Sequence, residues 1–298
     1  LTALKRQGED AHAVAMRESL IWEFKGHPYG RDPLLGLETI PGITVKDLKD
    51  FLRTFFVPSN MVIAVSGDIE KARAESGIKK LLDALPQTDA PERRLEAPAE
   101  SPPVLAFVHK PGQVQSQVAL GLRSVERTHP AFWKMSLLVN IFGGGDSLMY
   151  RRLRDDLGLV YAAYFYQTFK WKAGMLVGYI GCKGDKTGDA ITETLSIMEK
   201  LHQNVPETSF GLKRLDTLNS FVFNVDTPSE LVDVYSRYYL RKEPLDTLER
   251  IQQAYMETSR EELERLAGRY LVPKKAYIVV VGDRSIPVRR NGSVKTLE

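Results

Sequence analysis

An arginine and a tyrosine seven residues apart, Arg154 and Tyr161, are the two side chains of this sequence best suited to gripping a peptide. They flank a corner at which a predicted helix, capped by Ser147, ends at Gly158 and passes into a strand that begins at Leu159. The spacing leaves two interpretations open. The pair holds a ligand, or Arg154 is a solvated surface charge near acids and Tyr161 an ordinary strand aromatic.

Three glycines, Gly143, Gly144 and Gly145, precede this corner and predict the end of a helix that begins near Pro130. Gly144 and Gly145 also allow a ligand to approach the backbone closely. As a phosphate-binding loop the run is weak evidence, because it follows a predicted helix instead of a strand and lacks the Lys-Ser/Thr pair that grips phosphate. A nucleotide-binding module is therefore the weakest of three functional hypotheses.

Metal ligands are poorly represented. The five histidines are too far apart for two of them to share a helix turn, so no H-x-x-x-H zinc pair exists, and only His12 is a candidate lone ligand. The single cysteine, Cys182, excludes an intramolecular disulfide and a multi-cysteine metal site, and its strand context predicts a buried small hydrophobe.

Composition points to an ordinary globular protein. The chain has 298 residues, enough for about two domains, with 43% apolar and 27% charged residues and a net charge of +3. We find no run of five like charges, and no apolar stretch approaches the roughly 20 residues that span a bilayer. These features favour neither nucleic-acid nor membrane binding.

An internal repeat organises the chain: residues 44–68 and 259–283 match at a constant offset, with a Thr or Ser helix cap, a Val-Pro pair and a terminal Gly-Asp. In each copy a proline ends the helix and a short apolar run follows, 61–65 and 276–281, which predicts a strand that is central in its sheet or covered on both sides. Two copies indicate a duplication of αβ units.

The predicted fold class is α+β, because strands cluster early and helices late in the second copy. We expect duplicated αβ units, each a mostly antiparallel sheet with helices packed on one face. The predicted ranges are a truncated C-terminal part of the first αβ unit at 1–85, a linker at 86–103, a complete second αβ unit at 104–285, and a tail at 286–298 whose final Leu-Glu is typical of a cloning remnant. Predicted strands are 104–109, 117–123, 159–169, 174–182 and 276–281.

Taken in order, these motifs resemble the pitrilysin/insulinase-type zinc peptidases, which include mitochondrial processing peptidase and bacterial relatives. The resemblance rests on Phe142 to Tyr161, on Gly26-His-Pro-Tyr-Gly-Arg31, on Lys110-Pro-Gly with Gln117, and on the two repeat endings. It covers essentially the whole chain. It implies two similar αβ units forming half of a clamshell, the first of which carries H-x-x-E-H and a third glutamate ligand.

In that family an Arg/Tyr pair from the second unit contacts substrate backbone near the scissile bond; carried over, the pair is Arg154 and Tyr161. Both side chains are donors that could orient a peptide carbonyl and stabilise developing negative charge. No H-x-x-E-H occurs in this chain, and the position expected for the third ligand falls near Ala3, with Glu9 and Asp10 the nearest acids. The resemblance thus implies no metal site and no complete catalytic site here.

The leading prediction is the C-terminal, substrate-gripping portion of a metallopeptidase-like protein, in which Arg154, Tyr161, Gly144 and Gly145 bind substrate. Hydrolysis would need a zinc-bearing unit in cis or in a partner, and zinc is expected only there. Expected partners are a peptide or unfolded polypeptide and a zinc-bearing subunit in a homo- or heterodimer. The alternative, motivated by Ala3, is a catalytically inactive scaffold or assembly subunit. A bacterial source is expected, and the sequence leaves the compartment unknown, with periplasm and cytoplasm both open.

Overall fold

The computed structural model describes residues 1–92, 94–221, 225–285 and 295–297. These residues form two compact units. The first contains residues 1–37, 96–216 and 254–298, and the second contains residues 38–95 and 217–253. The first unit holds the sheet and most of the core. No helix among the described residues is long and apolar enough to cross a membrane.

The sheet has six strands in the order β3-β4-β2-β5-β1-β6. The β3–β4, β4–β2 and β2–β5 pairs are antiparallel, whereas β1 runs parallel to both β5 and β6. The strands are β1 (Val104–His109), β2 (Gln115–Ser124), β3 (Val160–Lys170), β4 (Ala173–Lys183), β5 (Tyr277–Gly282) and β6 (Lys295–Leu297). The five predicted strands of the second αβ unit are confirmed, and β6 is an additional strand within the predicted tail.

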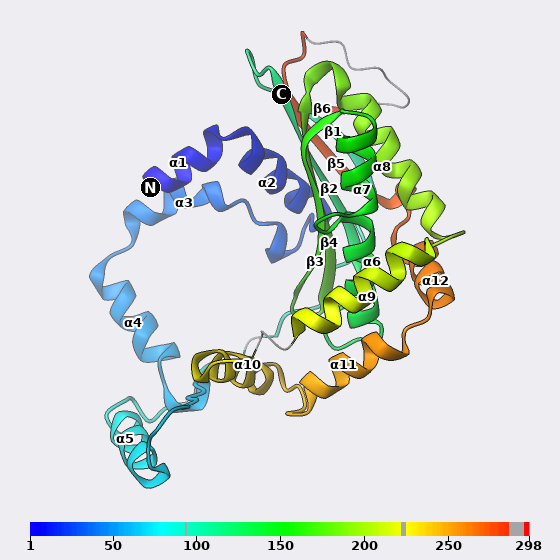
Figure 1. Cartoon of the computed structure of the whole chain (residues 1–298). Coiled ribbons are helices and arrows are strands. Elements are labelled where there is room, and N and C mark those ends of the chain that lie inside the picture. The colour runs from blue at the N-terminus through cyan, green and yellow to red at the C-terminus, as the bar shows by residue number, and fades with distance from the viewer. Residues whose placement is uncertain (93, 222–224, 286–294, 298) are drawn as a thin grey trace. The chain divides into compact units, whose positions relative to one another are not determined.

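Three helices cover one face of this sheet (Figure 1). Helix α6 packs against β3, α8 against β4, and α12 against β2 as well as against α6 and α8. Helix α6 is apolar nearly all round, which is typical of a helix buried between a sheet and other helices. The bounds are α6 (Phe132–Gly143), α8 (Thr187–Leu201) and α12 (Arg260–Tyr270). The predicted α+β class, with a mostly antiparallel sheet and packed helices, is confirmed.

A further helix, α2 (Ala11–Glu23), packs against β2 and β5 from the other side of the sheet (Figure 1). The contact is made by small side chains, which let the helix approach the strands closely. They include Ala11 and Ala15 on the helix and Ala106 and Ala119 on the strands. All six residues of β5 are buried, as expected for a strand covered on both sides.

The compact units do not follow the predicted ranges. Helices α1 (Thr2–Glu9) and α2 group with the second αβ unit, although their sequence positions fall in the predicted first unit, 1–85. The reason is the sheet contact of α2, which no local pattern encodes. Further helices are α3 (Gly36–Thr39), α9 (Glu207–Phe221), α10 (Pro228–Arg241) and α11 (Thr247–Glu257).

The second compact unit contains α4 (Val45–Phe55) and α5 (Lys71–Asp83). The predicted cap of α4 is confirmed: the Thr44 hydroxyl accepts a hydrogen bond from the Asp47 N–H, and the Asp47 carboxylate accepts one from the Thr44 N–H. The strand predicted at 61–65 is wrong, because these residues form no ladder in the described structure. Its repeat counterpart β5 has neighbours on both sides, and an extended segment becomes a strand only when another strand pairs with it.

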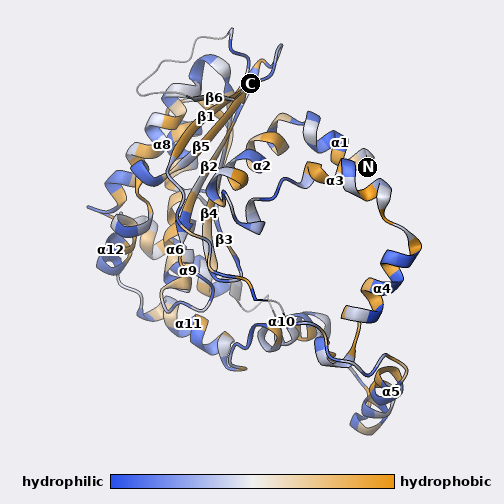
Figure 2. Ribbon diagram, turned by 180° about the vertical axis from the view of Figure 1, so that it is seen from behind, coloured by the Kyte–Doolittle hydropathy of each residue, from blue (hydrophilic) through white to orange (hydrophobic). Residues whose placement is uncertain are grey.

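Helix α4 also carries an exposed apolar face, visible as hydrophobic positions along the helix in Figure 2. Leu48 is 57% exposed, whereas its repeat counterpart Leu263 in α12 is fully buried. Val45, Phe51 and Leu52 are more than half exposed as well. The two copies therefore share a sequence pattern but differ in what covers them.

Candidate functional site

The segment between α6 and β3 departs from the single helix predicted there. Ser147 caps a short helix, α7 (Leu148–Tyr150), by accepting a hydrogen bond from the Tyr150 N–H at 3.1 Å. The chain then continues as a π-helix, Arg151–Asp156, before Gly158 turns it with a φ of 57°. Single π turns are uncommon and frequently occur at functional sites. Arg154 lies within this turn.

A second irregularity places Tyr161. In the β3–β4 ladder Val160 pairs with Cys182 and Ala162 pairs with Gly181, so Tyr161 is the extra residue of a β-bulge. Side chains alternate between the two faces of a strand. The extra residue Tyr161 therefore places Val160 on the opposite face from the one it would occupy in a regular strand. Val160 consequently points into the core at 6% exposure, while Tyr161 is 48% exposed.

The structure brings Arg154 and Tyr161 together. The Arg154 guanidinium donates a hydrogen bond from Nη1 to the backbone carbonyl of Tyr161, and it lies 5.6 Å from the Tyr150 ring centroid. Neither side chain points into the core: Arg154 is exposed and the Tyr161 ring is half-exposed. The sequence placed both at one corner, and the tertiary structure gives them a direct contact.

Arg154 differs from the two arginines that precede it. Arg151 pairs with Asp146 at 3.5 Å, and Arg152 pairs with Glu193 at 3.2 Å. Arg154 has no carboxylate partner among the residues that the structure describes. Its charge is thus left available to an external acceptor. The hydrogen bond to the Tyr161 carbonyl fixes the position of the guanidinium.

The three glycines have separate roles. Gly143 is the last residue of α6 and lies against β3, where an added Cβ would be 2.1 Å from the Phe165 Cβ; close packing, and not a left-handed cap, requires glycine there. An added Cβ at Gly144 would be 3.0 Å from the Asn140 carbonyl oxygen, whereas Gly145 faces open space. The Gly145 carbonyl accepts a hydrogen bond from the Lys213 ammonium.

A cluster of aromatic side chains, not predicted from the sequence, lies on the face of β3 and β4 that carries Tyr164 and Tyr179. Tyr164 and Tyr166 follow Tyr161 along β3, and Tyr164 lies 5.0 Å from Tyr179 of β4, between ring centroids. Partial burial raises the pKa of Tyr164, Tyr166 and Tyr179. The alternation of tyrosines along 161–166 was the available signal, but the bulge had to be known before Tyr161 could be placed with them.

His12, the candidate lone ligand, belongs to this cluster. Its Nε2 lies 3.0 Å from the Tyr164 hydroxyl, and its ring meets the Tyr179 ring edge-on at 4.5 Å. The described residues contain no group of three or more His, Cys, Asp or Glu side chains that could hold a metal ion. Of the two nearby acids, the Asp10 carboxylate caps α2 by accepting from the Ala13 N–H, and the Glu9 backbone carbonyl accepts from Lys110.

The family model described as "Peptidase M16 inactive domain" matches residues 42–214, more than half of the chain. The chain belongs to this family. The match includes the whole segment from α6 to β4 that carries Arg154 and Tyr161. The predicted assignment to the zinc peptidase family as its non-zinc-binding portion is confirmed.

Individual relatives and solved structures are similar to this M16 inactive-domain chain over most of its length. An uncharacterized zinc protease of Mycobacterium bovis is 24% identical over 94% of this chain, and the chain spans 65% of the length of that relative. The structure of a peptidase M16 inactive domain from Pseudomonas fluorescens matches 98% of this chain and 70% of its own, with a TM-score of 0.88 and 22% identity. A chain of complex III from Candida albicans has the same fold, with a TM-score of 0.78 and 12% identity over 94% of this chain and 69% of its own.

Proposed function

We propose that this chain is the substrate-gripping portion of a zinc peptidase-like protein, with hydrolysis carried out by a zinc-bearing unit in cis or in a partner subunit. The observation that carries the proposal is the contact between Arg154 and the backbone of Tyr161, in an M16 inactive domain whose described residues hold no metal site. The supporting relatives are named zinc proteases.

The geometry supports backbone recognition over recognition of one side chain. Arg154 retains N–H donors beyond the one that binds the Tyr161 carbonyl, and a guanidinium offers five. The Tyr161 hydroxyl adds a donor on an exposed ring. A peptide carbonyl placed between them would accept from both side chains, which would fix the peptide's direction relative to the open face of the sheet. The open backbone at Gly145 leaves room for the peptide to pass.

The exposed face of α4 supports pairing with a further segment. Helix α12 and strand β5 are the repeat counterparts of α4 and of residues 61–65. They lie in the compact unit that contains the sheet, where α6, α8 and neighbouring strands cover them. The repeat therefore indicates what would cover α4 and residues 61–65: helices and strands of an αβ unit of the same design. We propose that the zinc-bearing unit supplies them.

Peptide binding by the chain itself tests the gripping role. A fluorescein-labelled, extended peptide is titrated with the wild-type chain and with Arg154→Gln and Tyr161→Phe, followed by fluorescence anisotropy. We expect each variant to weaken binding about tenfold, the loss typical of one hydrogen bond to a charged group or a phenol. Arg151→Gln is the matched control, because its side chain pairs with Asp146 on the same segment. Equal binding by all four proteins would refute the role.

A catalytically inactive scaffold is the second candidate function. Its supporting observation is the fold shared with a chain of complex III, together with Ala3 at the position expected for a zinc ligand. A scaffold would bind no peptide and would still form a stable complex through the α4 face. Size-exclusion chromatography of the chain with the candidate zinc-bearing unit, beside the anisotropy titration, separates the two functions.

A further inference from the structure

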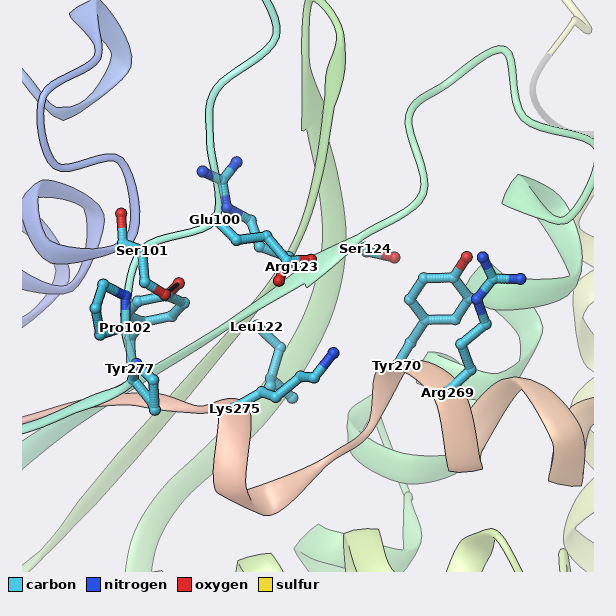
Figure 3. Close-up of a pocket in the computed structure, with 11 residues that line it drawn as sticks. Glu100, Ser101, Pro102, Leu122, Arg123, Ser124, Arg269, Tyr270, Lys275 and Tyr277 are labelled. Atoms are coloured by element: carbon cyan, nitrogen blue, oxygen red, sulfur yellow. Dashed lines mark hydrogen bonds between the residues drawn. The ribbon is translucent and has the colours of Figure 1, made fainter.

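A cavity of about 590 Å³ lies at the end of the sheet, away from the segment that carries Arg154. It opens between the end of β2, the chain leading into β1, and the turn that joins α12 to β5 (Figure 3). Its volume is within the range of about 300–1,000 Å³ that is typical of small-molecule sites. The whole lining belongs to the first compact unit: Glu100, Ser101, Pro102, Pro103, Leu122, Arg123, Ser124, Arg269, Tyr270, Lys275 and Tyr277.

The charge on the lining is positive. Arg123, Arg269 and Lys275 contribute three cations, and Glu100 is the one acidic residue of the lining. Arg269 and Lys275 form no ion pair with any residue that the structure describes. The Arg269 guanidinium carbon lies 5.2 Å from the centroid of the Tyr270 ring. Two cations on the lining therefore lack a counterion.

Arg123 is a fixed wall of the cavity. Its Nη2 donates to the backbone carbonyls of Glu23 and Ala99, at 3.1 and 2.9 Å, and its guanidinium carbon lies 3.9 Å from the centroid of the Phe24 ring. The side chain is mostly buried, so its charge is weakly screened by solvent. Its Nε lies 3.8 Å from a carboxylate oxygen of Glu23, which offsets its charge when ionised, so the positive potential of the cavity comes chiefly from Arg269 and Lys275.

An unsatisfied hydroxyl marks the interior. The Oγ of Ser124 is buried and has no hydrogen-bond partner among the described residues. Buried polar atoms without a partner are uncommon in native proteins. Ser124 is a lining residue, and a turn of its side chain toward the cavity would give this hydroxyl a partner on an occupant. The Tyr270 hydroxyl is a further donor on the same side of the cavity (Figure 3).

The two ends of the cavity differ in chemistry. Pro102, Leu122 and the Tyr277 ring line one side, and the Tyr277 hydroxyl is already occupied by the Ser101 carbonyl at 2.6 Å. Tyr270 and Arg269 line the other side, with Lys275 extending between the two (Figure 3). An occupant would therefore place an anionic group near the cations and Ser124, and an apolar part against the proline and leucine.

We propose that this cavity binds a small organic anion, a carboxylate or phosphate head on an apolar body, held by Lys275, Arg269 and the Ser124 hydroxyl. Both head groups accept hydrogen bonds from ammonium, guanidinium and hydroxyl donors, and either would restore the missing partner of Ser124. The site is independent of peptide gripping, because it shares no residue with the Arg154 corner.

Isothermal titration calorimetry on the whole chain tests the site. The probes are phenyl phosphate and phenylacetate, which separate the two head groups, and the neutral 2-phenylethanol. We expect at least one anion to bind at one site per chain and the alcohol not to bind. Binding should weaken as salt is raised, because screening reduces the attraction between the head group and the two exposed cations. Absence of binding by both anions would overturn the proposal.

Variants locate the binding. Lys275→Gln and Arg269→Gln should each weaken anion binding about tenfold, as expected for loss of one charge-assisted hydrogen bond. Both residues are exposed, so folding should be unaffected. Lys274→Gln is the matched control, since Lys274 is also exposed and precedes Lys275 but does not line the cavity. Ser124→Ala should weaken binding severalfold. An equal loss in the Lys274 variant would show nonspecific surface attraction and would also overturn the proposal.

Discussion

Glu23 offers a direct test of how the sheet and α2 are packed. The side chain is 1% exposed, and one carboxylate oxygen, Oε1, is buried without a hydrogen-bond partner among the described residues. The other oxygen lies over β2 at Gly121, where an added Cβ would be 2.8 Å from it. Arg123 is the nearest cation, with its Nε 3.8 Å from Oε1. Burial raises the pKa of Glu23 to about 7, against a smaller lowering by Arg123.

The sign of the pH dependence follows from this raised pKa. The folded protein holds the Glu23 proton more tightly than the unfolded chain does, so the stabilisation is fully present below the ordinary pKa of 4.5 and is lost as pH rises through about 7. A difference of this size corresponds to about 3 kcal/mol of unfolding free energy. Glu23→Gln removes the titration while keeping the size of the side chain.

Urea unfolding at intervals between pH 4.5 and 8.5 measures the effect. All three tryptophans, Trp22, Trp133 and Trp171, belong to the compact unit that contains Glu23, so their fluorescence follows that unit. The wild-type chain should lose about 3 kcal/mol more than Glu23→Gln over this range. Glu199→Gln, at an exposed glutamate of α8, should follow the wild type. Parallel curves for wild type and Glu23→Gln would refute the packing of α2 on β2.

Three further predictions concern packing, thiol chemistry and capping. Gly143→Ala should destabilise the first unit by about 1–3 kcal/mol in urea unfolding, because its Cβ would meet Phe165, whereas Gly145→Ala should have little effect; equal values would contradict the close contact. Burial raises the pKa of the Cys182 thiol to about 11, so it should react with a disulfide reagent only after unfolding, and rapid labelling of the native chain would show otherwise. Thr44→Ala should speed amide hydrogen exchange in α4, since loss of such a cap costs about 1 kcal/mol, and unchanged exchange would rule the cap out.

Much of the fold could be predicted from local patterns. Alternation and continuous apolar runs predicted the five strands of the second αβ unit, and caps such as Ser147 and Ser259 marked where helices begin. The strand expected at 61–65 shows the limit of such patterns. Its apolar residues match those of β5, but strand formation depends on a neighbour that local sequence does not specify.

The candidate site likewise has a part that local sequence predicts and a part that depends on contacts between distant segments. The sequence selected Arg154 and Tyr161 through their motif, but the aromatic cluster around Tyr164 and Tyr179 joins β3, β4 and α2, and the contact of His12 with Tyr164 spans 152 residues. Such contacts between distant segments leave no periodic signal in one sequence.

By itself, the sequence showed the internal repeat, the family resemblance and the candidate Arg/Tyr pair, because motifs and repeats are carried by residue order. Only the tertiary structure decided where those two side chains point. Arg154 lies in a π-helix turn, and a β-bulge sets the face that Tyr161 occupies. The bulge is defined by the pairing of β3 with β4, which residue order alone does not specify. Packing likewise decided that α2 belongs with the sheet of the second repeat, since its small residues find their complement there.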